Sequence, residues 1–461
     1  MPTGRRKQAR EQDLFISTSD LPKTAARTYY RKLNRFLAEA DFDRKVEKLA
    51  EPYYATSGGA GRPSIPPGIY VRMLLVGYLE GISSERAIAL RCADSLALRE
   101  FLGYSLTEGT PDHSTISGTR RRLPVEWHEE VFALLTSILA KKRILKGDTL
   151  AIDASTIEAN AAMRSIVRKD TTQSYPEYVE ALAKASGIKS PTAAELQRFD
   201  RKRKGKKLSN DDWEHPNDPH AKITRMKDGR TRMGYKVEHA VDTDSGAIVA
   251  GEVHEGDDGD TTSGPETIDR AQLTMARIKD HVATFETKRA DVVMDKGYFK
   301  GEMLVDLGRN GYRPYVSEPE IGRRRWTRKG KLTEEKARER DAVYANRRRT
   351  RSARGRRLAR KRSEFAERSF AHALATGGFR RTWLRGRENI AKRYHLHAAG
   401  HNLAILMRSI FGVGKPKGLT AAMCALVAAL CALLDRVSRF IEHFTRFLRA
   451  ECRVARRKVV A

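Results

Sequence analysis

Apolar residues follow two different spacings along the chain, and these divide it into a helical part and a mixed part. From about residue 23 to residue 142 they recur at helical intervals, as Tyr29, Leu33 and Leu37 do at a four-residue step, which places them on one face of a helix. From Thr149 onward, short apolar runs alternate with longer amphipathic stretches, the pattern of strands separated by helices. The spacing therefore predicts an all-α N-terminal region followed by an α/β region.

Turn and capping residues mark the helix ends of the N-terminal region. Pro66-Pro67 precedes an apolar run and is expected to open a helix, while Gly81 separates two helices. Ser114 is expected to cap a further helix, which runs into a basic triplet made of Arg120, Arg121 and Arg122. The helical domain, residues 21–145, has two open interpretations: helix–turn–helix DNA binding, or a structural cap with a basic surface.

Five apolar runs in the second part predict one mixed sheet, with elements in the order β-β-β-α-β-α-β-α. The runs lie at residues 149–153, 234–241, 247–253, 291–295 and 313–316. Residues 242–246 (DTDSG) are expected to join the second and third strands as a hairpin. Helices are expected near 262–281 and 303–307, and a polar, charged stretch at about 162–230 interrupts the pattern as a surface insertion.

Composition adds a polyanionic partner to this picture. The 461 residues include 88 Lys and Arg against 58 Asp and Glu, a formal net charge of +30, and 40% of them are hydrophobic. That hydrophobic share supports a real core and argues against wholesale disorder. The charge favours nucleic acid or an acidic membrane surface as partner, with an ordinary basic enzyme as the alternative. Ten of the basic residues fall within residues 347–362, where there is no acid.

Membrane insertion and secretion are disfavoured. The N-terminus lacks the apolar segment of a signal peptide, and the longest apolar run, residues 421–434, is shorter than the ~18 residues that indicate a membrane span. We interpret that run as a core helix or as a helix that binds a partner. The four cysteines form no CxxC pair, so neither a disulfide framework nor a zinc site is expected, and a reducing cytoplasm is the simple inference.

Two of the predicted strands end on an aspartate, Asp153 and Asp295. In α/β domains the loops at strand ends carry the catalytic groups, and carboxylate oxygens suit Mg²⁺ or Mn²⁺. With a third carboxylate from a helix they would form a two-metal site, which stabilises the attacking and leaving oxygens of a phosphoryl displacement. The alternative is that both aspartates only cap the turn that follows.

A series of short segments adds a family resemblance. They are residues 81–86 (GISSER), 101–103 (FLG), 111–117 (PDHSTIS), 152–159 (IDASTIEA), 234–240 (GYKVEHA), 294–298 (MDKGY), 366–370 (AERSF), 384–386 (LRG) and 402–403 (NL). In this order they make the chain resemble the bacterial insertion-sequence DDE transposases, from about residue 25 to about residue 415. The resemblance implies an α/β fold with a ribonuclease-H-like mixed sheet flanked by helices, preceded by the all-α domain and interrupted by the insertion.

The domains expected on this basis cover the whole chain. A flexible arm, residues 1–20, precedes the helical domain, and a helical tail follows from residue 411 to residue 461. The catalytic domain lies between them, at residues 146–410. It contains the insertion and a basic segment at residues 323–362.

The resemblance also implies the site. Asp153 and Asp295 correspond to the first and second acids and Glu367 to the third, with Glu364 as its rival on the same helix face. Glu367 is preferred because Glu-x-x-Phe, then Gly-Gly and Leu-Arg-Gly, match the family around its glutamate. The three acids are expected to hold two Mg²⁺ ions, which Mn²⁺ can replace. Leu374 is a departure, since relatives often carry a basic residue seven positions after the glutamate.

Two further positions have two interpretations each. Asp260 resembles a recurrent family aspartate, and we interpret it first as a helix N-cap and second as an auxiliary site residue. Trp383, which lies close to Arg381 and Arg385, has the chemistry to stack on an extruded base. The more common explanation for such a residue is a buried aromatic side chain.

The function implied is that of a transposase, which binds the ends of an insertion sequence, cleaves DNA with metal ions and transfers the freed strand into target DNA. A metal-dependent nuclease without strand transfer and a catalytically decayed DNA-binding protein are the alternatives. The expected partners are the terminal inverted repeats, target DNA and at least a second copy of the chain, in the bacterial cytoplasm at the nucleoid and away from membranes. DNA contacts are expected from Arg120, Arg121, Arg122, Arg347, Arg348, Arg349, Arg357, Arg380, Arg381 and Arg385.

Overall fold

The computed structural model describes residues 24–54, 64–204, 208–286, 290–320, 324, 326–327 and 332–459. The arm expected at residues 1–20 lies outside the described residues, as does residue 323, where the basic segment was expected to begin. Within the described ranges the chain has a helical N-terminal part, a mixed sheet covered by helices, and a long C-terminal helix. This confirms the predicted mixed α/β class.

The N-terminal part is helical, as predicted. Its α-helices are α1 (Ala25–Glu39), α2 (Phe42–Ala50), α3 (Pro67–Glu80), α4 (Glu85–Asp94), α5 (Leu96–Leu102), α6 (His113–Arg122) and α7 (Val125–Lys141). Pro67 begins α3, and Gly81 ends it with a φ of +73°, a left-handed conformation that favours glycine. The predicted cap of α6 is wrong. Asp112 Oδ1 accepts a hydrogen bond from Thr115 N at 2.9 Å, while Ser114 lies inside the first turn and donates to Asp112.

The sheet has the predicted order of strands. Its members are β1 (Thr149–Glu158), β4 (Lys222–Arg225), β5 (Thr231–Asp242), β6 (Ile248–Glu255), β7 (Asp291–Met294) and β8 (Arg313–Val316). Strand β5 pairs antiparallel with β1, β4 and β6, whereas β7 runs parallel to both β1 and β8. The succession β6-β5-β1-β7-β8 is that of a ribonuclease-H-like sheet, and β4 is an addition to it.

The hairpin between β5 and β6 forms where it was predicted. Asp242 accepts hydrogen bonds from the backbone and hydroxyl of Ser245, at 3.1 and 2.6 Å. Gly246 closes the turn with a φ of +78°, and its N–H donates to the carbonyl of Asp242 at 2.8 Å. A side chain at Gly246 would also approach the ring of Phe365. The turn therefore requires glycine for both its conformation and its packing.

Helices cover both faces of the sheet. Alternation along β5 sends Glu238 to one face and His239 to the other. Glu238 bonds Ser263 and Thr267 of α10 (Asp260–His281), so α10 lies on the first face. On the second face His239 bonds Ser369 of α13 (Ala353–Phe370) and Tyr394 of α14 (Arg387–Phe411). The remaining helices of this part are α11 (Gly301–Arg309) and α12 (Glu334–Arg351).

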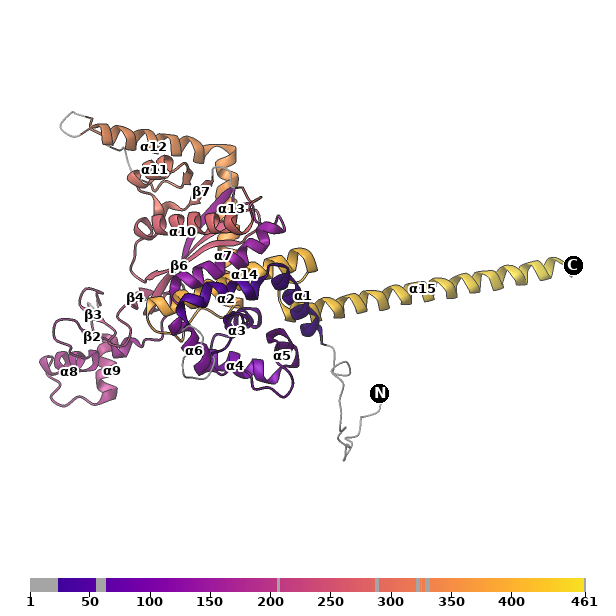
Figure 1. The fold of residues 1–461 in the computed structure, drawn as a ribbon, viewed down its shortest axis with the longest axis horizontal. Helices are drawn as coiled ribbons and strands as arrows, with labels where there is room; N and C mark the ends of the chain where they lie inside the picture. The colour runs from indigo at the N-terminus through magenta and orange to yellow at the C-terminus, as the bar shows by residue number, and fades with distance from the viewer. Residues whose placement is uncertain are drawn as a thin grey trace.

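The predicted insertion folds as a small lobe of its own, separate from the sheet in Figure 1. It contains β2 (Val167–Arg168), α8 (Tyr175–Ala185), α9 (Ala193–Lys202) and β3 (Trp213–Glu214). Capping boxes begin both helices, at Ser174 and at Thr192. The ring of Trp213 packs edge-on against Tyr175 and Tyr178, at 5.5 and 5.2 Å between centroids. An aromatic cluster therefore holds the lobe together.

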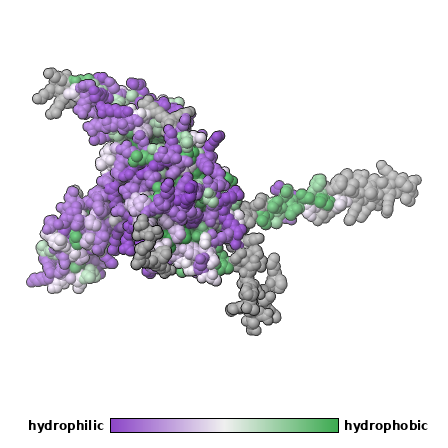
Figure 2. Space-filling view, viewed as in Figure 1, coloured by the Kyte–Doolittle hydropathy of each residue, from purple (hydrophilic) through white to green (hydrophobic). Residues whose placement is uncertain are grey.

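The C-terminal apolar run lies in α15 (Pro416–Val459), which leaves the body as a single long helix (Figure 1). Its base contacts α1. Side chains farther along are exposed, including Val427, Leu430 and Leu434, and Figure 2 shows this apolar surface in green. The core-helix interpretation is therefore wrong, and the partner-helix interpretation stays open. No helix in the described ranges is long and apolar enough to cross a membrane.

A set of buried histidines makes the fold sensitive to acid. Burial lowers the pKa of His128, His397 and His401 to about 3, and that of His395 to about 4. These side chains stay neutral when folded, whereas in the unfolded chain they take up a proton near pH 6.5. We therefore expect stability to fall as the pH drops below ~6.5, by up to about 1.4 kcal/mol per pH unit for each histidine. Urea unfolding at a series of pH values measures this, and a midpoint that stays constant down to about pH 5 would contradict it.

Candidate active site

Asp153 and Asp295 lie side by side on the face of the sheet that α13 covers. Residues Ala151 and Val293 are paired neighbours in the parallel ladder of β1 and β7, so Asp153 and Asp295 each follow two residues later on the same face. Burial raises the pKa of Asp153, and the negative charge of Asp295 raises it further. Asp295 Oδ1 accepts a hydrogen bond from Gly297 N at 2.8 Å. The structure thus brings the first two predicted acids together.

The position of Asp153 within its strand differs from the prediction. Strand β1 was expected to end there, but it continues to Glu158 because β5 pairs with it along this whole stretch. The parallel ladder with β7 covers only Thr149 to Ala151. Asp153 therefore lies two residues beyond the last residue of β1 that pairs with β7, and its carboxylate is partly accessible.

Arg362 of α13 reaches the carboxylate of Asp153, with 3.3 Å between Nη1 and Oδ2. The positive charge of this guanidinium lowers the pKa of Asp153, against the effect of burial. Asp153 Oδ1 accepts from Ala154 N at 2.9 Å. The helix is held over the sheet on both sides of this contact, by Leu358 against Val293 and by Ser369 against His239.

Asp260 lies next to Asp295 across Gly297. A Cβ on Gly297 would lie 2.5 Å from Asp260 Oδ2 and 3.1 Å from Asp295 Oδ1. Lys236 Nζ holds the other oxygen of Asp260 at 2.6 Å. The N-cap of α10 is Gly259, and Asp260 is its first helical residue, so the N-cap interpretation of Asp260 is wrong. Its position beside Asp295 leaves the interpretation as an auxiliary site residue.

A buried polar network supports the loop after β7 that carries Asp295. The sequence alone did not predict this network. Glu238 is fully buried and accepts hydrogen bonds from Tyr298 and Thr267, each at 2.5 Å, and from Ser263 at 3.1 Å. Burial raises the pKa of Glu238, and the hydrogen bonds oppose that rise. Tyr298 lies three residues after Asp295, so the network anchors the chain that carries this acid. The signal was present in the segment at 234–240, where Lys236 and Glu238 alternate with apolar residues.

Glu367 and Glu364 lie on α13 and are exposed. Glu364 bonds Arg368 at 2.5 Å along the helix. Among the described residues, no three His, Cys, Asp or Glu side chains are close enough together to hold a metal ion. The structure therefore does not bring Glu367 into one group with Asp153 and Asp295. Leu374 lies in the π-helical turn that follows α13 and is buried in the core, which gives this position a packing role.

The two aspartates nevertheless have the donor chemistry that a divalent ion needs. Carboxylate oxygens are the hard ligands that Mg²⁺ and Mn²⁺ prefer. Asp153 and Asp295 are only partly buried, and they are near enough for the charge of one to shift the pKa of the other. A cation would remove that repulsion. The pair therefore fits a metal site that is completed by a third ligand.

The arginines predicted to bind DNA fall into two groups. Arg120 is 6% exposed and forms an ion pair with Glu85, which itself is mostly buried. It is buried where the helical part meets α14, because its Nε donates to Asn389 at 3.4 Å, and the prediction of a surface contact at Arg120 is wrong. Arg347 bonds Glu318 with two nitrogens at 2.9 Å each, and Arg349 donates to the carbonyl of Pro314 at 3.0 Å. The exposed members of the set are Arg121, Arg122, Arg348, Arg357, Arg380, Arg381 and Arg385.

Trp383 is 50% exposed, so its interpretation as a buried aromatic is wrong. The guanidinium of Arg381 lies over its ring, 4.7 Å from the centroid. Trp383 Nε1 donates to Ser83 Oγ at 3.1 Å, a contact between the part that contains the sheet and the helical part. An exposed aromatic ring beside a cation is a surface on which nucleic acid bases stack.

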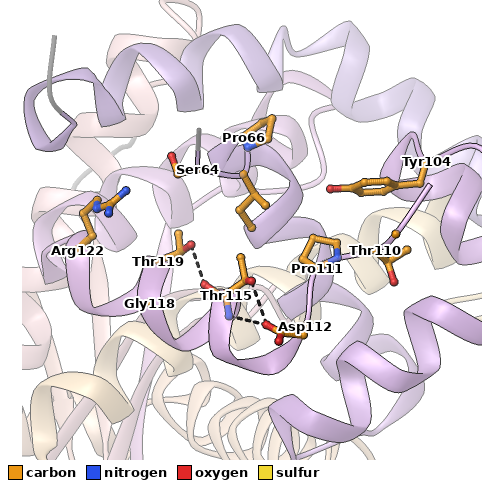
Figure 3. Close-up of a pocket in the computed structure, with 12 residues that line it drawn as sticks. Ser64, Pro66, Tyr104, Thr110, Pro111, Asp112, Thr115, Gly118, Thr119 and Arg122 are labelled. Carbon is orange, nitrogen blue, oxygen red and sulfur yellow. Dashed lines mark hydrogen bonds between the residues drawn. The ribbon is translucent and has the colours of Figure 1, made fainter. Parts of the chain in front are cut away.

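A cavity of about 720 Å³ lies in the helical part, away from these acids (Figure 3). Its lining includes Asp112, Thr115 and Arg122, together with Pro66 and Tyr104. Neither Asp153 nor Asp295 contributes to it. The candidate active site lies elsewhere, where β1 extends beyond its pairing with β7.

Two family models match the chain. Residues 21–122 match the model described as Transposase domain (DUF772), and residues 199–403 match the model described as Transposase DDE domain. The first match covers most of the helical part, and the second includes β5 to β8 and the helices α10 to α13. Searches of curated proteins and of solved structures found no match.

Proposed function

Because the chain belongs to the DDE transposases of insertion sequences, we propose that it binds the ends of such an element, cleaves DNA there and transfers the freed strand into target DNA. Transposition is the function of this family, and its DDE domains generally use divalent metal ions. The observation that carries the proposal is the closeness of Asp153 on β1 to Asp295, which directly follows the parallel strand β7, beneath a helix that bears Glu367.

The residues proposed to hold two Mg²⁺ ions, or Mn²⁺ in their place, are Asp153, Asp295 and Glu367. Bound ions of this kind activate water and stabilise the attacking and leaving oxygens at a phosphodiester. The residues around the three carboxylates determine where each carboxylate lies. Strand β1 fixes Asp153, the bond between Tyr298 and Glu238 fixes the loop of Asp295, and α13 carries Glu367.

The exposed arginines are proposed to hold the DNA backbone. Arg348 and Arg357 lie on the two helices that meet at Ser352, and Arg357 lies on the same helix as Glu367. Arg380, Arg381 and Arg385 follow the π-helical turn, where Trp383 offers a stacking surface. Guanidinium groups bind phosphate oxygens with two parallel hydrogen bonds, and such contacts position a duplex without reading its sequence.

Strand transfer distinguishes this function from its alternatives. The purified chain is incubated with Mg²⁺, a target plasmid and a duplex that carries the element's end with a free 3′-OH. Joined products support a transposase. Cleavage of intact end DNA without any joining indicates a nuclease, and specific binding with neither reaction indicates a decayed DNA-binding protein.

A second copy of the chain is the remaining partner proposed, and α15 is the surface that supports it. Val427, Leu430, Leu434, Val437 and Ile441 alternate at three and four residues, the heptad spacing of helices that pair. All five side chains are between 47% and 67% exposed. Pairing of two α15 helices would remove this apolar stripe from water.

We expect the double substitution Leu430→Glu and Leu434→Glu to convert the dimer to a monomer, because it places four charges in the paired stripe of two copies. Multi-angle light scattering after gel filtration measures the mass in solution. The matched control is Ala432→Glu, which places its charge on the opposite side of the helix. Equal masses for the double variant and the unsubstituted protein would rule out this interface.

A further inference from the structure

Arg362 stands apart from the other basic residues of the 347–362 run because of the acid it contacts. Arg347 bonds Glu318, Arg354 bonds Asp291 at 2.5 Å, and Lys361 bonds Asp244 at 2.8 Å. These acids lie outside the proposed metal site. Arg362 instead contacts Asp153, the first acid of that site. Its side chain is 17% exposed and that of Asp153 is 23% exposed, so water screens this pair less than it screens a surface pair.

The contact occupies the oxygen of Asp153 that no backbone group holds. Oδ2 faces the guanidinium of Arg362, and Oδ1 accepts from the backbone of Ala154. A guanidinium and a divalent ion cannot share one oxygen at this distance without strong repulsion. The arginine therefore substitutes for part of the charge that an ion would supply.

The surroundings of Arg362 also offer it another anionic partner when DNA is bound. The exposed residues Arg356, Arg357 and Arg360 lie on the preceding turns of α13. A phosphate backbone that lies along this helix would pass near Arg362. Phosphate oxygens accept paired hydrogen bonds from a guanidinium as a carboxylate does.

We infer that Arg362 is a gate on the metal site, which holds Asp153 in the DNA-free chain and releases it when a DNA phosphate takes the guanidinium. DNA and divalent ion then bind cooperatively, and linkage requires the effect to be reciprocal. The inference rests on the proposed function, since it takes Asp153 as a metal ligand. It adds that the site binds its metal ions weakly until DNA is present, which would limit cleavage of incorrect DNA.

Binding of Mn²⁺ to the full-length protein tests the gate without measuring cleavage. Free Mn²⁺ is followed by electron paramagnetic resonance, with and without a short non-specific duplex. For the unsubstituted protein we expect the duplex to tighten Mn²⁺ binding, by roughly 5- to 150-fold, the usual range for coupled sites. Arg362→Gln is expected to bind Mn²⁺ tightly without DNA and to gain little from the duplex.

Matched variants keep the result interpretable. Arg309→Gln removes an exposed arginine of α11, outside the proposed DNA-binding set, and should keep the full dependence on DNA. Arg362→Lys keeps the charge and is expected to stay close to the unsubstituted protein, which separates a charge effect from a packing defect. Thermal melts confirm that each variant is folded.

Two outcomes distinguish failure of the gate from failure of the metal site. Suppose that Arg362→Gln and the unsubstituted protein bind Mn²⁺ equally without DNA, while Asp153→Asn weakens Mn²⁺ binding in the presence of DNA. The proposed role of Arg362 is then wrong, and the proposed metal site is supported. If Asp153→Asn changes Mn²⁺ binding under neither condition, the proposed site itself is wrong, and the gate with it.

Discussion

Replacement of Asp153 or Asp295 by Asn is expected to reduce DNA cleavage by at least ~10³-fold, because several kcal/mol of metal-dependent stabilisation are lost at 1.4 kcal/mol per tenfold. Asn preserves the shape of the side chain and removes the negative charge that a divalent ion requires. Asp153 lies on a strand that β5 pairs and Asp295 directly follows β7, and both side chains are only partly buried, so the fold should persist. Gel-based cleavage of end DNA in Mg²⁺ measures the loss, and a mobility-shift assay should show that DNA binding is retained.

A comparison of Glu367→Gln with Glu364→Gln identifies which glutamate is the third metal-binding acid. Both side chains are exposed on α13, so neither substitution disturbs the core. We expect the first to lose cleavage as the aspartate variants do, and the second to lose at most a surface ion pair with Arg368, worth roughly 0.3–0.5 kcal/mol of stability. The reverse result would transfer the role to Glu364. Full activity in both variants would remove α13 from the metal site.

Gly297→Ala is expected to abolish cleavage or reduce it severely, although the residue itself carries no chemistry. The added methyl group would meet Asp260 Oδ2 at 2.5 Å and Asp295 Oδ1 at 3.1 Å. Neither carboxylate is free to yield, because Lys236 holds Asp260 and the backbone of Gly297 holds Asp295. The second metal-binding acid is therefore displaced, and a displacement of about 1 Å can cost ~10²-fold in rate.

A double variant identifies the cause of that loss. Asp260→Ala removes the oxygen nearest to the new methyl group, so the variant that combines it with Gly297→Ala should recover activity relative to Gly297→Ala alone. Asp260→Ala by itself reports whether Asp260 has a role beyond packing. Gly308→Ala is the matched control, since a Cβ there meets no atom within 4 Å. No recovery in the double variant would show that the clash with Asp260 is not the cause.

Local signals in the sequence predict α3 and the β5–β6 turn, because neighbouring residues alone decide these structures. Pro67 and Gly81 bound α3 because proline and glycine restrict the backbone by themselves. The DTDSG turn forms because Asp242 and Ser245 bond within it. The order of strands and helices followed from periodicity, since the strands of the sheet bury apolar residues.

The errors at β1, Arg120, Trp383 and α15 share another cause, which is that elements distant in sequence determined the outcome. The N-caps of α6 and α10, by contrast, lie two residues and one residue before the predicted positions. The end of β1 moved from Asp153 to Glu158 because β5 pairs that far. Arg120 belongs to a basic triplet by sequence but is buried against Glu85. Conversely, Trp383 and the apolar run of α15 are exposed because no element in the described ranges covers them.

The candidate site divides in the same way. The sequence by itself supplied the candidate chemistry: two strand-associated aspartates, a glutamate in a basic helix, and the resemblance to DDE transposases that two family models support. Only the tertiary structure decided which groups meet, because pairing of β1 with β7 and the course of α13 involve residues far apart in the chain. It placed Asp260 against Gly297, buried Glu238 beneath Tyr298, and set Arg362 on Asp153. Charges interact through space rather than along the chain, and their balance at Asp153 is therefore a property of the fold.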